Sequence, residues 1–148
     1  MDHRQEHTLA IRLKICGRFL YYQIGGKAGQ QRILVQLLNR GHMTQRELQE
    51  LLEISSGALS EILQKMEDGG LIARAKNTAD KRRVDLSLTD EGREKAQAVK
   101  AHFLRTQDRM FECLTAEQKD QLEEILGVLT GHLDEIRSDP AFIKPRTK

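Results

Sequence analysis

Five basic residues gather in one short stretch of the chain, Leu71 to Leu88, where they could bind phosphate groups. They are Arg74, Lys76, Lys81, Arg82 and Arg83. Only Asp80 and Asp85 oppose them, so the stretch has a net charge of +3, whereas the whole chain carries +2. The stretch Thr115 to Arg137 carries −4. Positive charge is therefore concentrated at one place, as contact with a nucleic-acid backbone requires.

A second polar surface precedes the basic stretch, on a segment of helical period from Ser55 to Gly69. Its apolar face consists of Leu59, Ile62, Leu63 and Met66. The opposite face consists of Gly57, Ser60, Glu61, Gln64, Lys65 and Asp68. The first turn is small, because it holds Ser56, Gly57 and Ala58. This end of the helix could enter a DNA groove without steric obstruction.

Two side chains on the polar face are candidates for reading bases. The Gln64 amide could pair with adenine, and the Glu61 carboxylate could accept a hydrogen bond from cytosine. Glu61 also stands four residues before Lys65, the spacing of an ion pair along a helix. The sequence leaves both roles of Glu61 open.

Chemistry of other kinds has little support. The chain has no nucleophile elbow, phosphate-binding loop or paired-carboxylate motif, so we expect neither an enzyme nor a cofactor. The histidines are scattered, and the pair at ligand spacing, His3 and His7, lies at the terminus, so no metal site is predicted. Cys16 and Cys113 are too few and too far apart to indicate a disulfide framework.

The elements that must position these residues begin with a short helix. Thr44 and Glu47 have the spacing of a capping box, in which the two side chains satisfy backbone donors at a helix start. Ser55 or Ser56 then caps the polar-faced helix. The short helix is expected to direct three leucines inward, Leu48, Leu51 and Leu52.

Two strands follow the polar-faced helix. Leu71 to Lys76 forms the first, and Val84 to Leu88 forms the second because apolar and polar residues alternate along it. The charged loop Asn77 to Arg82 joins them. Helix, turn, helix and hairpin in this order predict a winged helix-turn-helix.

Further helices flank this unit. The segment from Thr8 to Tyr22 carries apolar residues on two stripes, so we expect its own domain to cover one side and a second chain the other. A connection rich in glycine, with Gly25 and Gly26, leads to a helix from Gln30 to Asn39. Two long helices, opened by Thr89 and by Thr115, follow the wing.

The run TQRELQELLEISSGALSEILQKMEDGGLI, the Asp80-Lys81-Arg82 tip and the sequence SLTDEG resemble the MarR family of bacterial transcriptional regulators. The resemblance is specific from Gln31 to Gly92 and covers most of the chain. It implies a mainly α fold with a small β-wing, in which a winged helix-turn-helix is flanked by N- and C-terminal dimerisation helices. One unit over 1–148 would hold dimerisation helices at 5–24 and 90–138, the DNA-binding region at 28–89 and a basic tail at 139–148.

The resemblance also assigns roles to residues. Ser55 to Lys65 would lie in the major groove, while Arg82 enters the minor groove and Asp80 orients its guanidinium. An arginine suits a narrow groove of high negative potential because it is long and weakly hydrated. The complete set of DNA-contact candidates is Gln45, Ser55, Ser56, Gly57, Ala58, Ser60, Glu61, Gln64, Lys65, Arg74, Lys76, Asp80, Lys81, Arg82 and Arg83.

The expected molecule is a homodimer that represses transcription from a pseudo-palindromic operator, with half-sites about one helical turn, ~34 Å, apart. The expected interface residues are Leu9, Leu13, Leu20, Leu126, Leu129 and Leu133. The resemblance also implies that a small-molecule effector, an oxidant or a metal controls the affinity for DNA, as is usual in the family. Cys16 is the candidate redox residue because Tyr21 and Tyr22 lie near it, as in peroxide-sensing members, although its apolar stripe favours a buried thiol.

A different class of function remains as an alternative: a protein-interaction module that keeps the winged fold without binding DNA. The basic wing argues against it, since such a surface needs no cluster of phosphate-seeking charges. No apolar run approaches the ~18 residues of a membrane span, and the N-terminus has no signal-peptide core, so we predict a cytoplasmic protein without a membrane partner.

Overall fold

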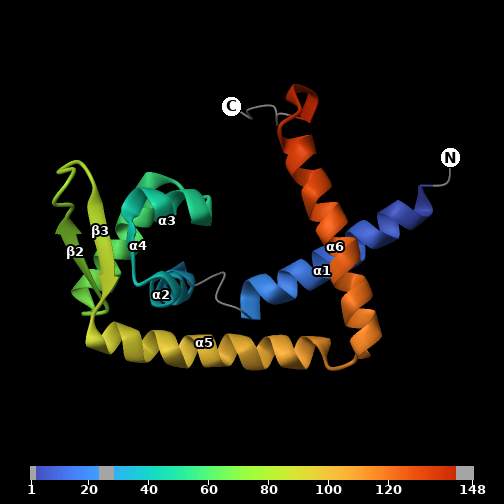
Figure 1. Cartoon of the computed structure of the whole chain (residues 1–148), viewed down its shortest axis with the longest axis horizontal. Helices are drawn as coiled ribbons and strands as arrows, with labels where there is room; N and C mark the ends of the chain where they lie inside the picture. The colour runs from blue at the N-terminus through green and yellow to red at the C-terminus, as the bar shows by residue number, and fades with distance from the viewer. Residues whose placement is uncertain (1–2, 24–28, 143–148) are drawn as a thin grey trace. The chain divides into compact units, whose positions relative to one another are not determined.

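The computed structural model describes residues 3–23 and 29–142 as a set of helices with one small sheet (Figure 1). The elements are α1 (Arg4–Gln23), α2 (Gly29–Arg40), β1 (His42–Thr44), α3 (Gln45–Leu52), α4 (Ser56–Asp68), β2 (Ile72–Lys76), β3 (Val84–Leu88), α5 (Asp90–Phe111), α6 (Ala116–Arg137) and a short 3₁₀ helix (Pro140–Phe142). The chain forms two compact parts, Met1–Thr106 and Gln107–Lys148, and α5 runs from one into the other. Gly25, Gly26 and the end of the basic tail lie outside the described residues.

The predicted wing is present as an antiparallel hairpin of β2 and β3, with α4 next to it (Figure 1). A third strand, β1, pairs with the other edge of β3 and gives the sheet order β1-β3-β2. The sequence analysis did not predict β1, because three residues are too few to show alternation. Met43 in β1 lies opposite Leu86 in β3, and both are buried.

The core of the first part lies between the winged unit's helices and its sheet. It is built from apolar residues at helical spacing, chiefly Ile33, Leu34, Leu37, Leu48, Leu59, Leu63 and Met66. The apolar face of α4 is thus used entirely for packing. One prediction for α3 is wrong, because Leu51 is 39% exposed. Leu48 and Leu52, four residues apart, share the buried face, whereas Leu51 lies about 60° round the helix from Leu48 and about 100° from Leu52, on the solvent side.

The predicted caps fix where the helices start. Thr44 and Glu47 form the capping box of α3, and Thr115 forms another with Gln118 at the start of α6. Ser55, rather than Ser56, caps α4 by accepting a hydrogen bond from the Ala58 amide. These side chains accept bonds from backbone groups that have no partner within the helix.

A close backbone approach joins the start of α5 to the end of α4. The Thr89 hydroxyl donates to the Gly70 carbonyl and accepts from the Gly92 amide, and the Thr89 amide donates to the Leu71 carbonyl. A Cβ on Gly92 would overlap that Leu71 carbonyl. Only glycine therefore fits at this position, while Gly70 is required by its positive φ of 73°.

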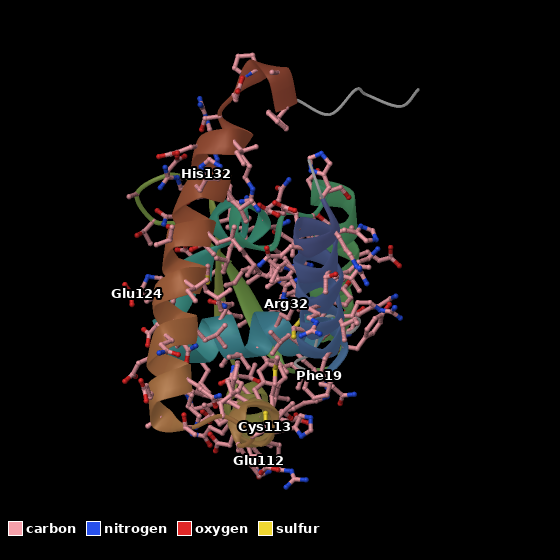
Figure 2. The ribbon with its side chains drawn as sticks, turned by 90° about the vertical axis from the view of Figure 1, so that its right-hand side faces the viewer. Phe19, Arg32, Glu112, Cys113, Glu124 and His132 are labelled. Atoms are coloured by element: carbon pink, nitrogen blue, oxygen red, sulfur yellow. The ribbon has the colours of Figure 1, made fainter. Side chains whose placement is uncertain are left out.

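Two long helices, α1 and α6, bury none of their residues within the described chain. In α1 the exposed apolar residues are Leu9, Ile11, Leu13, Ile15, Phe19, Tyr21 and Tyr22. Side chains such as Glu124 and His132 project from the sides of α6, which has no buried residue either (Figure 2). Cys16 and Cys113 are exposed, which for Cys16 contradicts the burial expected from its apolar stripe. For Cys16 the reason is that no described residue covers its helix.

Candidate nucleic-acid interface

The polar face of α4 is open to solvent, as its helical period predicted. The small first turn and the later polar positions are all exposed, namely Ser55, Ser56, Gly57, Ala58, Ser60, Glu61, Gln64 and Lys65. Leu59, Leu63 and Met66 hold the helix from the opposite side. Packing thus presents a surface whose first turn carries small side chains and whose later positions are polar.

Two contacts restrain the side chains on this face. The Gln45 side-chain amide in α3 donates to the Ser60 hydroxyl over 3.2 Å, so these two candidates support each other across the helix-turn-helix. The Lys65 ammonium lies 3.2 Å from the Glu61 carboxylate. The ion-pair role of Glu61 is therefore present in the free chain, and both side chains remain more than 60% exposed. Such an exposed pair is weak and can exchange partners at low cost.

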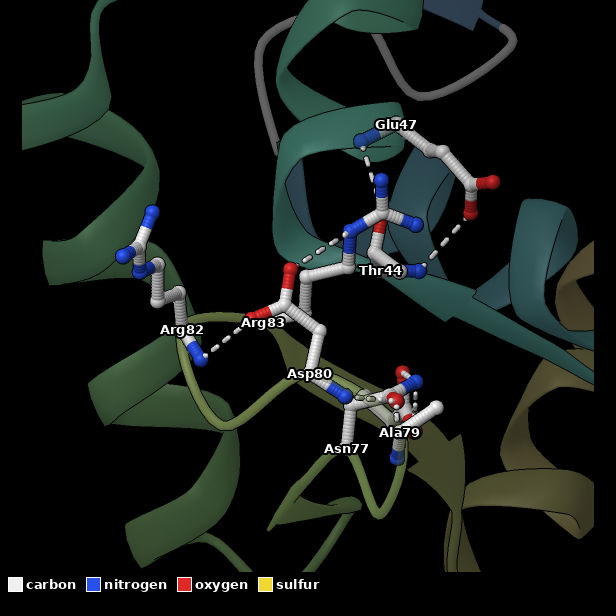
Figure 3. A network of polar contacts seen from close by, with 8 residues as sticks. Thr44, Glu47, Asn77, Ala79, Asp80, Arg82 and Arg83 are labelled. Atoms are coloured by element: carbon white, nitrogen blue, oxygen red, sulfur yellow. Dashed lines mark hydrogen bonds and ion pairs between the residues drawn. The ribbon is translucent and has the colours of Figure 1, made fainter.

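The wing tip is ordered by its own polar side chains (Figure 3). The side-chain oxygen Oδ1 of Asn77 accepts from the Ala79 and Asp80 backbone amides, and the side-chain nitrogen Nδ2 donates to the Asp85 carboxylate. One oxygen of Asp80 accepts from the Arg82 backbone amide over 3.0 Å. The loop conformation is thus set locally, as expected for Asn and Asp in turns.

The partner of the Asp80 carboxylate differs from the one expected. Its second oxygen lies 3.7 Å from Arg83 Nε, and the Arg82 guanidinium has no hydrogen bond or ion pair with any described residue. Figure 3 shows the Arg82 side chain extending away from Asp80. In the free chain Asp80 therefore orients the Arg82 backbone and the Arg83 side chain. The reason is local, because the loop turns the Arg82 amide, and not its side chain, toward the carboxylate.

The remaining basic candidates divide into two groups. Lys76 and Lys81 are exposed and without polar partners among the described residues, so they are free to contact phosphates. Arg74 is different, because its side chain is only 22% exposed and its guanidinium is bound to Glu67. Spacing along a strand could not reveal this pair, whose partner comes from α4.

The pKa of the Glu47 carboxyl group is displaced downward. The hydrogen bond that its carboxylate accepts from the Thr44 backbone amide lowers the pKa of Glu47, and the nearby Arg40 and Arg83 lower it further. The carboxylate is thus kept charged at the start of α3, beside the helix-turn-helix.

Other kinds of site receive no support from the described part of the chain. No group of three or more His, Cys, Asp or Glu side chains within residues 3–23 and 29–142 could hold a metal ion. No helix in the same residues is long and apolar enough to cross a bilayer. A pocket of about 620 Å³ occurs within the second part, lined by Phe111, Lys119, Leu122 and Leu126 among others.

Comparison with known proteins agrees with this geometry. Residues 27–84 match the model of the MarR family. The chain is 35% identical over 97 residues to the HTH-type transcriptional repressor MdtR of Bacillus subtilis. The aligned region covers 66% of this chain and 63% of MdtR. It is 30% identical over 109 residues to the HTH-type transcriptional regulator FarR of Neisseria gonorrhoeae, covering 74% of this chain and 75% of FarR. The match thus spans less than two thirds of the length of MdtR, and it spans three quarters of the length of FarR.

The fold resembles that of solved regulators as well. The S. aureus MepR–DNA complex gives a TM-score of 0.72 at 19% identity, covering 84% of this chain and 97% of that one. At this identity the likeness concerns the fold, and it confirms the predicted winged helix-turn-helix with additional helices. MdtR and FarR are described as transcriptional regulators, in agreement with the expectation of a protein that is not an enzyme. By its sequence and its fold, the chain belongs to the MarR family.

Proposed function

We propose that this protein is a sequence-specific DNA-binding transcriptional repressor, in which α4 enters the major groove and the wing contacts the adjacent backbone and minor groove. The observation that carries the proposal is the combination of an exposed polar helix, whose first turn is small, with a wing that presents three cations. The charged side-chain groups of Arg82, Lys76 and Lys81 have no polar partner among the described residues. Free cations of this kind release counterions from DNA when they bind phosphates. The similarity to MdtR, a transcriptional repressor, and to FarR, a transcriptional regulator, supports the same function.

The proposal includes a homodimer on a pseudo-palindromic operator. The uncovered apolar residues of α1, and separately those of α6, support it, because exposed apolar residues gathered on one helix mark a candidate protein interface. None of the six proposed interface leucines is buried in the single chain: Leu9, Leu13, Leu20, Leu126, Leu129 and Leu133. Two copies related by a two-fold axis would match two half-sites related in the same way.

Control of affinity by an effector is the third part of the proposal. A ligand that favours one spacing of the two α4 helices would shift the population toward or away from the operator geometry. The pocket lined by Phe111, Lys119 and Leu122 has the size of a small-molecule site. Cys16 offers a second route, since its thiol is exposed and therefore open to oxidation in the single chain.

A gel shift on the DNA upstream of the protein's own coding sequence tests the proposal. The protein should retard that duplex at low salt and lose affinity steeply as salt rises. If no duplex is retarded at low salt, DNA binding is wrong and the interaction-module alternative gains. The same assay with small aromatic acids tests the effector, and with organic peroxide it tests the thiol. Cys16→Ser should abolish release by peroxide while leaving release by an acid intact.

A further inference from the structure

Three polar side chains connect the later half of α4 to the first strand of the wing. Arg74 Nη2 in β2 donates to Gln64 Oε1 over 2.7 Å and to Glu67 Oε1 over 3.3 Å, while Arg74 Nε donates to Glu67 Oε2 over 3.2 Å. The Gln64 side-chain amide in turn donates to Asp68 Oδ1 over 2.8 Å. We call Gln64, Glu67 and Arg74 the helix–wing clamp.

The clamp has the geometry of a specific contact. Two nitrogens of the guanidinium meet the two oxygens of one carboxylate, an arrangement that the planar fork of arginine allows and the single ammonium of lysine does not. The Arg74 and Glu67 side chains are 22% and 37% exposed, so water screens this pair less than the Glu61–Lys65 pair, whose side chains are 71% and 64% exposed.

The clamp leaves two of its members little freedom for DNA. The Arg74 guanidinium faces α4, and its charge is balanced by Glu67. Both groups of the Gln64 amide are already bonded, the oxygen to Arg74 and the nitrogen to Asp68. A bidentate contact with adenine would need both groups at once, so it would break both bonds.

We propose that Arg74 is a positioning residue, which with Glu67 and Gln64 fixes the orientation of the recognition helix α4 relative to the wing. Arg74 then contacts no phosphate, and Gln64 reads no base in the bound state. Base reading falls to the earlier half of α4, at Ser56, Gly57, Ser60 and Glu61. The inference rests on the proposed DNA binding. It divides the DNA-facing surface into residues that contact bases and residues that hold α4 in position.

The test begins with a duplex selected from a random pool by the unchanged protein. Affinities for this duplex and for an unrelated one are measured over a range of salt. Arg74→Lys keeps the charge but loses the fork, and Glu67→Gln keeps the shape but loses the charge. Each should lower the ratio of selected to unrelated affinity by about tenfold, with the slope of log affinity against log salt unchanged. The double variant should be no worse than the single ones, because both remove one interaction.

Other roles of Arg74 give different results, each of which would overturn the inference. If Arg74 contacted phosphate, Arg74→Lys would bind almost normally, Glu67→Gln would bind as well or better, and Arg74→Gln would reduce the salt slope by about 0.9. If the clamp only stabilised the fold, the active fraction would fall while the ratio of affinities stayed constant. Lys76→Gln is the positive control for a lost phosphate contact. Arg109→Gln, which breaks an exposed pair with Glu112 far along α5, controls for a lost surface charge.

If the unchanged protein enriches no duplex from the random pool, that result contradicts the proposed function itself, and the clamp inference with it. Enrichment followed by the phosphate pattern would contradict the clamp inference alone. The two failures are therefore distinguishable in one series of measurements.

Discussion

Arg82 is the residue on which the proposed contact between the wing and DNA depends most directly. Its guanidinium has no described partner, so transfer to a DNA groove costs no existing bond. Arg82→Ala should weaken binding to the selected duplex by about tenfold or more and reduce the salt slope by about 0.9, since one cation is lost. Binding measured by fluorescence anisotropy over a range of salt gives both quantities. Arg137→Ala, a similarly exposed arginine in α6, is the matched control, and equal effects of the two changes would contradict the wing role.

A second prediction at the scale of single residues concerns Gly92 and the free energy of unfolding. Gly92→Ala places a Cβ on the Leu71 carbonyl oxygen, so the junction between α4, β2 and α5 must shift. We expect the free energy of unfolding to fall by roughly 3 kcal/mol, at the upper end for overpacking. Urea denaturation followed by circular dichroism measures it. Gly57→Ala, also near a helix start but with open space around the added Cβ, should leave stability unchanged or raise it slightly.

At the scale of elements, the capping box at the start of α3 makes the stability of the fold depend on pH. The folded state lowers the pKa of Glu47, chiefly through the Thr44 amide, so it holds this carboxylate charged at pH values where the unfolded chain binds a proton. The stabilisation is therefore present above the unfolded pKa of Glu47 and is lost as pH falls through the lowered folded value. In melting experiments Glu47→Gln should be less stable than the parent at pH 7, and the difference should shrink as the solution is acidified. A difference that is constant with pH would exclude this role of the charge.

The elements also show why sequence reasoning succeeded in some places and not in others. Caps at Thr44, Ser55 and Thr115 were predictable because a side chain and a backbone group three residues away decide them. The strand β1 was missed, since its pairing with β3 is a contact between distant segments. The same distinction applies to the site. Exposure of the α4 face follows from helical period, whereas the partner of Arg74 depends on how β2 lies against α4.

At the scale of the whole molecule, the proposed dimer would combine contacts to DNA with a contact between two chains. A single α4 and wing bring few free cations, so one copy should bind weakly. A second copy, held at fixed spacing, adds its contacts without a second loss of translational freedom. The helices α1 and α6, which bury nothing in the single chain, are the parts available to set that spacing.

Leu13→Glu tests whether α1 serves the association of two chains while α4 and the wing contact DNA. The side chain is 43% exposed in the single chain, so a charge there is tolerated by the monomer but opposed in an apolar interface. Sedimentation should show the parent at twice the 16.9 kDa chain mass and the variant at the chain mass. Affinity for the selected duplex should fall at least about a hundredfold, because the gain from two linked sites is lost.

The control is Lys14→Glu, which puts the same acid on the neighbouring polar position of α1. It should remain dimeric and keep most of its affinity. Circular dichroism of both variants verifies that helix content is retained, so that loss of the dimer is not confused with unfolding. A Leu13→Glu protein that still sediments as a dimer would exclude the α1 stripe as an interface. One that is monomeric yet binds with full affinity would separate operator recognition from dimerisation, since each winged unit would then suffice alone.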